Sequence, residues 1–262
     1  MTESTLFTIA FALYAVSLVI YFVTLLVKRD KGSRAAYVLA LGGFLFHAAA
    51  LAVRTAASGH APFTNMYESL SFLSWAIVLA LLVFARPSRA PRLGPCLMLI
   101  VVGLVALASS PLMPKEAAPL VPALQSYWLW LHVSVTLLGE AFFAVAFVAS
   151  ILYIATPAPD KKERFDALAY RAVAVGFPLF TLGGLIFGMI WAYRAWGRYW
   201  AWDPKEVWSL ITWLVFALYL HTRIVMGWKG KRSAVIAIVG FLAALFTYFG
   251  VNYLLTGLHS YA

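Results

Sequence analysis

The sequence predicts an all-α, polytopic integral membrane protein with about eight transmembrane helices in a single membrane domain, residues 1–262. Three observations predict this class. Of the 262 residues, 63% are hydrophobic and 11% are charged, whereas a soluble domain is roughly half apolar and a quarter charged. The mean hydropathy is +0.87. The apolar residues also form runs of about 20, the length that a helix needs to cross a bilayer. A water-soluble domain is therefore excluded.

In chain order, the apolar runs predict helices at about 6–27, 35–53, 66–85, 93–109, 128–156, 168–193, 207–226 and 233–255. The first run has no basic residue before it and is too long for the apolar part of a signal peptide, so we expect it to be retained. Four prolines between 110 and 127 predict a non-helical connection. In the sixth helix, Pro178 predicts a kink, and Gly184 and Gly188 form a GxxxG spacing that allows close helix packing.

The seventh helix has a well-defined predicted start. Asp203 is a favoured N-cap, and Pro204 is favoured at the first helical position, where its missing N–H costs nothing. Glu206 stands where its side chain can reach back to the cap. We therefore expect Asp203, Pro204 and Glu206 to have a structural role first.

The basic residues indicate which way the helices face. The net charge is +10, which would suit a nucleic-acid partner if the charge were gathered in one patch. Instead, 15 of the 20 lysines and arginines fall in loops on one side of the predicted membrane and five on the other. The positive-inside rule places the fifteen in the cytoplasm. Both termini and the loop 194–206 are then extracytoplasmic, and we expect no nucleic-acid partner.

The chain has one cysteine, Cys96. A single cysteine excludes an internal disulfide, a CxxC redox pair and a thiolate metal site within the chain. Any thiol chemistry must therefore use the thiols of another molecule.

Six of the ten tryptophans lie between residues 191 and 213, a stretch that we call the tryptophan segment. Tryptophans gather at headgroup depth in many membrane proteins, so an interfacial aromatic belt is one interpretation. Six in 23 residues, together with Arg194, Arg198 and Tyr199, exceed what one interface needs. Indole rings beside guanidinium groups favour the binding of a flat, aromatic, anionic ligand.

Four histidines are placed by depth in the membrane. His132 and His259 lie near the outer surface, where two neutral imidazoles beside the tryptophan segment would suit the two axial positions of a six-coordinate heme iron. Each taken alone is more often an ordinary interfacial histidine, whereas the two together with the tryptophan segment favour heme ligands. His47 and His221 lie inside the bilayer, nearer the cytoplasmic side for His221, where ionisable residues are costly and often functional.

Four other polar residues are notable. Arg54 follows His47 by seven residues and so shares its helix face, and Glu68 is placed to pair with it. Glu140 lies two turns from His132, and its role is unassigned. His60 is expected in a turn or at the surface.

The sequence resembles the CcsA (ResC) family, which carries the WWD signature of System II cytochrome c biogenesis. The resemblance is carried by the stretch WGRYWAWDPKEVWSLITW at 196–213 and its continuation to 223. Further similar segments are GHAPFTNMYES at 59–69, QSYWLWLHV at 125–133 and GLHSY at 257–261. The resemblance therefore runs over most of the chain.

This resemblance implies export of heme b as a transported substrate, and its covalent attachment to the CxxCH thiols of an apocytochrome c at the extracytoplasmic face. The chain would be the heme-binding subunit of a cytochrome c synthetase, a heme lyase, in a bacterial plasma membrane or a thylakoid membrane. Its implied partners are a CcsB (ResB)-like membrane subunit, apocytochrome c and a thioredoxin-like thiol reductant.

The implied site residues fall into three groups. His132 and His259 match the outer axial ligands, and His221 matches the intramembrane heme ligand, with His47 as a substitute for a second ligand that is otherwise attributed to the partner subunit. The heme platform is predicted to comprise Trp191, Trp196, Trp200, Trp202 and Trp208. Propionate or peptide contacts are expected from Arg194, Arg198 and Lys205. The only metal expected is the heme iron.

Two other classes of function remain open from the sequence. A bis-histidine membrane cytochrome b would retain its heme for electron transfer, with paired histidines deep in facing helices. A heme-free transporter or assembly scaffold would use the tryptophans only as anchors.

Overall fold

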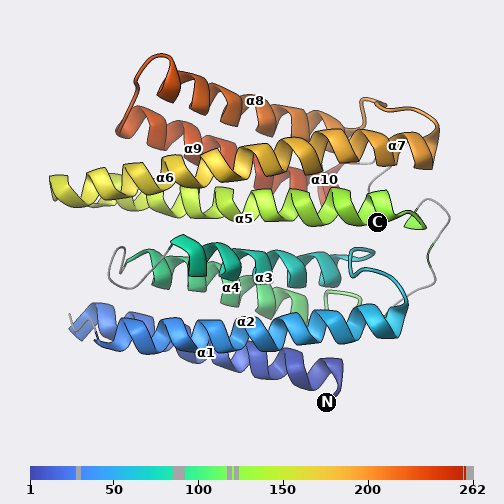
Figure 1. Ribbon diagram of the computed structural model, residues 1–262, viewed down its shortest axis with the longest axis horizontal. Helices are drawn as coiled ribbons and strands as arrows, with labels where there is room; N and C mark the ends of the chain where they lie inside the picture. Colours follow the sequence, from blue (N-terminus) through green and yellow to red (C-terminus); the bar gives the residue numbers. More distant parts are fainter. Residues whose placement is uncertain (28–30, 85–91, 117–119, 121–123, 256, 258–262) are drawn as a thin grey trace. The chain divides into compact units, whose positions relative to one another are not determined.

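The computed structural model describes residues 1–27, 31–84, 92–116, 120, 124–255 and 257. The regular elements within these ranges are all helical, which confirms the predicted fold class. The chain divides into two compact units, residues 1–118 (unit 1) and 119–262 (unit 2) (Figure 1).

Unit 1 is a bundle of four helices: α1 (Glu3–Val27), α2 (Lys31–Ser58), α3 (Met66–Phe84) and α4 (Leu93–Ser109). Helix α1 packs on α2 and α4, and α3 also packs on α2 and α4, so the four close into a ring. Tyr14, Leu70, Ile77 and Leu97 fill its interior. Apolar residues of α1 also cover the outside, with Val19 60% and Leu26 79% exposed. A helix that is apolar on both faces is suited to lipid.

Unit 2 is arranged around α5 (Tyr127–Ala155), which packs against α6 (Pro159–Phe180) and α9 (Lys231–Leu245) (Figure 1). Helix α8 (Pro204–Ile224) packs against α9 and α6. The rings of Phe143 on α5 and Phe216 on α8 stack with their centroids 3.6 Å apart. Gly139 on α5 and Gly176 on α6 bring the two backbones into direct contact, because a Cβ on Gly139 would lie 2.8 Å from the backbone N of Phe180.

Two helices of unit 2 change their winding partway. Helix α6 continues through a π-helix, η2 (Thr181–Phe187), into α7 (Gly188–Trp196). Helix α9 continues through a second π-helix, η3 (Phe246–Gly250), into α10 (Val251–Leu254). A π-helix bonds each N–H to the carbonyl five residues back, is rare, and occurs often at functional sites. Helix η2 leads into α7, which carries Trp191 and Trp196, and η3 leads into α10, which precedes His259 in the sequence.

The apolar runs recovered the helices well but not their ends. In the described part of the chain, seven helices are long and apolar enough to cross a membrane. The predicted span 93–109 corresponds to α4, an apolar helix of 17 residues. Helix α6 begins at Pro159, nine residues before the predicted start at 168. Its first turns are charged, so hydropathy misses them, and Asp166 there accepts two hydrogen bonds from Arg223 on α8 at 2.8 Å each.

Of the two glycines of the predicted GxxxG pair, Gly188 lies against α5, whereas Gly184 does not. A Cβ on Gly184 would meet the ring of Phe180 on its own helix first, at 3.4 Å, an ordinary contact. Gly183 and Gly188 lie against α5 instead: a Cβ on Gly183 would collide with the backbone of Thr136, and one on Gly188 would lie 3.0 Å from His132. In η2 the N–H of Gly188 bonds to the carbonyl oxygen of Gly183, so these two glycines lie one π-helical turn apart.

Candidate functional site

The tryptophan segment comprises the end of α7, a loop at 197–203 and the start of α8. Helix α7 ends at Gly197, whose φ of 74° is in the left-handed region. Trp191 and Trp196 on α7 meet edge to face with centroids 5.9 Å apart, and Trp200 and Trp202 in the loop do so at 5.8 Å. The predicted platform residues thus form two aromatic pairs on either side of Gly197.

The other two tryptophans of the segment pack within unit 2. The ring of Trp208 lies against Phe246 of η3, with centroids 4.2 Å apart. The indole N–H of Trp213 donates to Thr181 Oγ1 of η2 at 2.9 Å. These contacts connect α8 to both π-helices, so Trp208 has a packing role besides the platform role predicted for it.

Trp202 has an unusual backbone for its size. Among the described residues other than glycine, it alone has a positive φ, 59°, and its side chain is exposed. Bulky residues rarely adopt this conformation, so surrounding contacts must hold it. Glu206 Oε2 accepts from the N–H of Ala201 at 2.7 Å and from that of Asp203 at 3.2 Å, which fixes the backbone on both sides of Trp202.

The cap of α8 also anchors the chain that leads to residue 259. The capping box is present: Asp203 accepts from the N–H of Lys205, and Glu206 accepts from that of Asp203. Lys205 Nζ donates to Asn252 Oδ1 on α10 at 3.0 Å. A Cβ on Gly257 would lie 2.5 Å from Asp203 Oδ1, so the backbone of Gly257 lies directly against the cap.

The cations of the segment differ in their surroundings. Arg194 and Arg198 are exposed, next to Tyr193 and Tyr199, whose rings stack with centroids 4.5 Å apart. Lys205 is directed inward, and its Nζ donates to Asn252 Oδ1 on α10. The lysine therefore links the start of α8 to α10, whereas Arg194 and Arg198 are exposed.

His132 lies in the second turn of α5, half-buried against η2 and α7. Its Nδ1 donates to the carbonyl oxygen of Gly183 at 2.8 Å. Its ring is parallel to that of Trp191, with an angle of 7° between the planes and centroids 5.8 Å apart. The structure therefore places the predicted ligand His132 in contact with the predicted platform residue Trp191.

The second predicted outer ligand, His259, lies outside the described residues. The described chain reaches Gly257, two residues before it, at the cap of α8. The pairing of His132 with His259 on one iron therefore stays a prediction.

The two histidines predicted inside the membrane have different environments in their own units. His221 on α8 of unit 2 is exposed, on a face where Leu214 and Leu218 are each 52% exposed. His47 on α2 of unit 1 is fully buried. Its Nε2 lies 2.8 Å from Ser71 Oγ and its Nδ1 lies 3.4 Å from the hydroxyl of Tyr14. An iron at His47 would have to displace one of these contacts.

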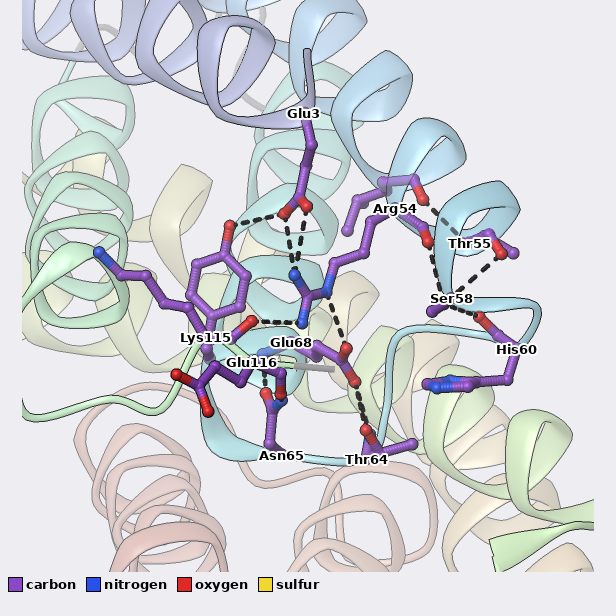
Figure 2. Close-up of polar contacts among 12 residues, drawn as sticks. Glu3, Arg54, Thr55, Ser58, His60, Thr64, Asn65, Glu68, Lys115 and Glu116 are labelled. Carbon is purple, nitrogen blue, oxygen red and sulfur yellow. Dashed lines mark hydrogen bonds and ion pairs between the residues drawn. The ribbon is translucent and has the colours of Figure 1, made fainter. Parts of the chain in front are cut away.

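Unit 1 holds a polar network centred on Arg54 (Figure 2). The predicted pair is present, with Arg54 Nε donating to Glu68 Oε1 at 2.7 Å. Arg54 also donates to Glu3 at 3.2 Å and to the carbonyl oxygen of Lys115 at 2.9 Å. Glu68 accepts from the N–H and the hydroxyl of Thr64 at 2.8 Å each. His60 lies in the adjoining turn, buried, with its Nδ1 3.0 Å from the carbonyl oxygen of Ala61.

Several residues of the site carried no signal in the sequence. Gly183, Asn252 and Gly257 act through a backbone carbonyl, a side-chain amide and the lack of a side chain. None of these properties depends on residue type in a pattern that one sequence displays. The tryptophan cluster and the capping box, in contrast, consist of residue types that can be recognised in the sequence itself.

Comparisons with known proteins agree on one family. Residues 63–259 match the family described as cytochrome C assembly protein. The cytochrome c biogenesis protein CcsA of Chlamydomonas reinhardtii is 44% identical over 227 residues, which are 80% of this chain and 64% of that protein, so the chain spans less than two thirds of the algal relative. CcsA of Synechococcus sp. (strain CC9902) is 38% identical over 288 residues, covering 96% of this chain and 94% of that protein.

A solved structure has the same fold. The cytochrome c heme lyase CcmF superposes with a TM-score of 0.71 at 21% sequence identity. The likeness covers 95% of this chain and 47% of that one.

Proposed function

This chain belongs to the cytochrome c assembly protein family, and on that premise we propose that it holds heme at the outer face of the membrane for covalent attachment to apocytochrome c. Heme b is its substrate and cargo in this proposal. The relatives named for cytochrome c biogenesis support the role, and the names do not specify the ligand residues. Those residues are proposed from the site.

The observation that carries the proposal is the setting of His132. An imidazole beside a cluster of indoles, with its Nδ1 already donating to a carbonyl, is chemically suited to bind heme iron through its other nitrogen. His259 is the proposed second axial ligand. Two imidazoles keep the iron six-coordinate while the porphyrin edge reacts.

The surrounding residues fit a flat anionic ligand. Trp196, Trp200 and Trp202 offer aromatic surface for the porphyrin, while the buried Trp191 lies parallel to the His132 ring. The exposed Arg194 and Arg198 suit the propionates. In the part of the chain that the structure describes, the buried indole N–H of Trp200 has no acceptor. A carboxylate in the site would satisfy this donor. Lys205 is not proposed as a propionate contact, because it binds Asn252.

The chemistry asked of the protein is positioning. Each thiol of the CxxCH peptide adds across one vinyl group: a sulfur–carbon bond forms on one vinyl carbon, and the other carbon gains a hydrogen. The S–H bond and the vinyl π bond break in this addition, so no oxidant is needed. A disulfide between the two cysteines must first be reduced, a step that we assign to a thioredoxin-like protein. Holding the two partners in register supplies the rate gain. The histidine of CxxCH then displaces one imidazole and releases the product.

An inner heme site is proposed at His221. Its exposure on an apolar face of α8 suits a ligand shared with a CcsB (ResB)-like membrane subunit. His47 stays a predicted alternative that would have to give up Ser71 or Tyr14. The proposed membrane is that of a bacterial cell or a thylakoid, and the distribution of basic residues supports an outer position for the tryptophan segment.

A variant of His132 tests the proposal. His132→Gly, co-expressed with the partner subunit and an apocytochrome c, should lose the outer heme signal and the covalent product. Added imidazole should restore part of both, because it can occupy the vacated axial position. Normal holocytochrome formation by this variant would overturn the assignment. Heme that stays bound and cycles between redox states without reaching the apocytochrome would instead identify a membrane cytochrome b.

A further inference from the structure

We infer that the π-helix η2 sets the tautomer and orientation of His132, with Gly183 and Gly188 as its positioning residues. The Gly183 carbonyl holds the Nδ1 proton, and the bare surface of Gly188 leaves room for the ring. Nε2 is then the nitrogen that faces the iron. This inference rests on the proposed function and adds to it the two residues that prepare the ligand.

The tautomer follows from the hydrogen bond. His132 Nδ1 lies 2.8 Å from the Gly183 carbonyl oxygen, and a carbonyl oxygen can only accept. Nδ1 therefore carries the proton, and in a neutral imidazole the lone pair is then on Nε2. Partners of this kind fix ring orientation and raise ligand basicity in metal sites generally.

The π winding explains why this carbonyl is available at this place. The N–H of Gly188 bonds to the Gly183 carbonyl, five residues back. A regular α-helix would pair that carbonyl with the N–H of residue 187 and turn the following residues to another face. In η2 the same oxygen accepts from both Gly188 and His132. The lack of a side chain on Gly183 lets this backbone touch that of Thr136 on α5.

Gly188 supplies the second restraint. A Cβ at this position would lie 3.0 Å from both Nδ1 and Cε1 of the His132 ring, closer than an ordinary contact. Three residues further along the same helix, Trp191 lies parallel to the ring. A methyl group at 188 would therefore push the imidazole away from Gly183 or from Trp191.

The test compares two alanine variants of neighbouring glycines. Gly188→Ala adds a methyl group against His132, while Gly184→Ala adds one only against Phe180 of its own helix, at 3.4 Å. The full chain with its partner subunit is titrated with ferric heme b and followed by absorption and electron paramagnetic resonance. We expect Gly188→Ala to lower outer-site heme affinity about 10- to 100-fold and to alter the low-spin signal. Gly184→Ala should match the unmodified protein.

A measurement without substitution covers the case in which Gly188→Ala does not fold. The heme-free chain, labelled with ¹⁵N-histidine at a pH where imidazoles are neutral, is studied by NMR, and His132→Asn identifies the signal. We expect the Nδ1–H tautomer for His132. The Nε2–H tautomer, or an unchanged heme affinity and spectrum in folded Gly188→Ala, would overturn the inference.

The two proposals fail differently. If His132→Gly retains the outer heme signal, the proposed ligand is wrong. If His132→Gly loses that signal while Gly188→Ala keeps it and the NMR shows Nε2–H, only the role of η2 is wrong.

Discussion

Trp202 combines a backbone conformation that is costly for a bulky residue with a side chain that is 71% exposed. Such conformations cost about 1–3 kcal/mol and persist where other contacts impose them. Here Glu206 imposes it through two backbone N–H groups. An exposed indole recovers little of this cost by burial, so the conformation is better explained by what the indole contacts in the complex with its ligand.

Substitution of Trp202 is predicted to affect the stability of the protein and its heme binding differently. Asparagine tolerates positive φ, so Trp202→Asn should leave the free energy of unfolding unchanged or raise it by up to about 1 kcal/mol. Heme occupancy of the outer site should fall, because an indole of the platform is lost. Thermal unfolding and heme content of the purified variant measure the two effects. A clear loss of stability would show instead that the indole contributes to packing.

His47 and His221 are predicted to respond oppositely to substitution. His47→Gln breaks a buried hydrogen-bond pair with Ser71 and should cost about 1–3 kcal/mol of stability while the heme spectrum stays unchanged. His221→Gly, at an exposed position, should change stability little and remove the inner heme signal.

Thermal unfolding and heme spectra of both variants check this pair. Ser71→Ala serves as the control, since it should reproduce the effect of His47→Gln without touching the imidazole. Loss of heme in a fully stable His47→Gln would assign His47 as the ligand that the sequence proposes.

Residues at the start of α8 also contact the chain near its C-terminal end. Lys205 donates a hydrogen bond to Asn252 on α10, and Asp203 lies against Gly257. The C-terminal segment is thus tied to the tryptophan segment before residue 259 is reached.

Gly257→Ala should therefore act like loss of the second axial ligand. Its Cβ would lie 2.5 Å from Asp203 Oδ1 and 3.1 Å from Pro204 Cδ, so the segment must move. We expect the outer heme to lose its six-coordinate spectrum while helix content is retained. Gly103→Ala, where a Cβ would meet nothing within 4 Å, is the matched control. An unchanged spectrum in Gly257→Ala would show that this contact does not position the ligand.

Helices and caps were largely predictable, whereas the π-helices were not. Asp203, Pro204 and Glu206 specify the start of α8 by chemistry that adjacent residues display. In η2, one extra residue per turn leaves an apolar run equally apolar, so hydropathy does not detect it. The contact of Gly183 with α5, which the GxxxG spacing did not indicate, occurs in the same π-helix.

In the membrane-spanning helices, apolar residues occur both on the faces packed against other helices and on the exposed faces, so hydropathy does not distinguish the two. Hydropathy predicts both His47 and His221 within the membrane but does not tell the buried imidazole from the exposed one. Family membership was available from the tryptophan segment alone. The pairing of Arg54 with Glu68 was also predictable. Helix spacing put Arg54 on the same face as His47, and Glu68 follows Arg54 closely in the chain. The pairing of Arg54 with Glu3, 51 residues away, was not predictable.

The Arg54 network joins α1, α2, α3 and the segment after α4, so it should matter for the folding of unit 1 as a whole. Glu68→Gln leaves a buried guanidinium without its closest charge partner and should cost about 3–5 kcal/mol. Glu3→Gln is the milder control, since the Glu3 side chain is 26% exposed. Thermal unfolding of both variants measures the difference, and equal losses would contradict the ranking.

The position of the only cysteine has a consequence for the substrate peptide. Cys96 lies part-buried in α4 of unit 1, whereas every residue proposed for the outer site belongs to unit 2. Exchange between a thiol and a disulfide requires an accessible thiolate on the attacking side. Since residues 119–262 contain no cysteine, none of the residues proposed for the outer site can itself form a mixed disulfide with an incoming apocytochrome.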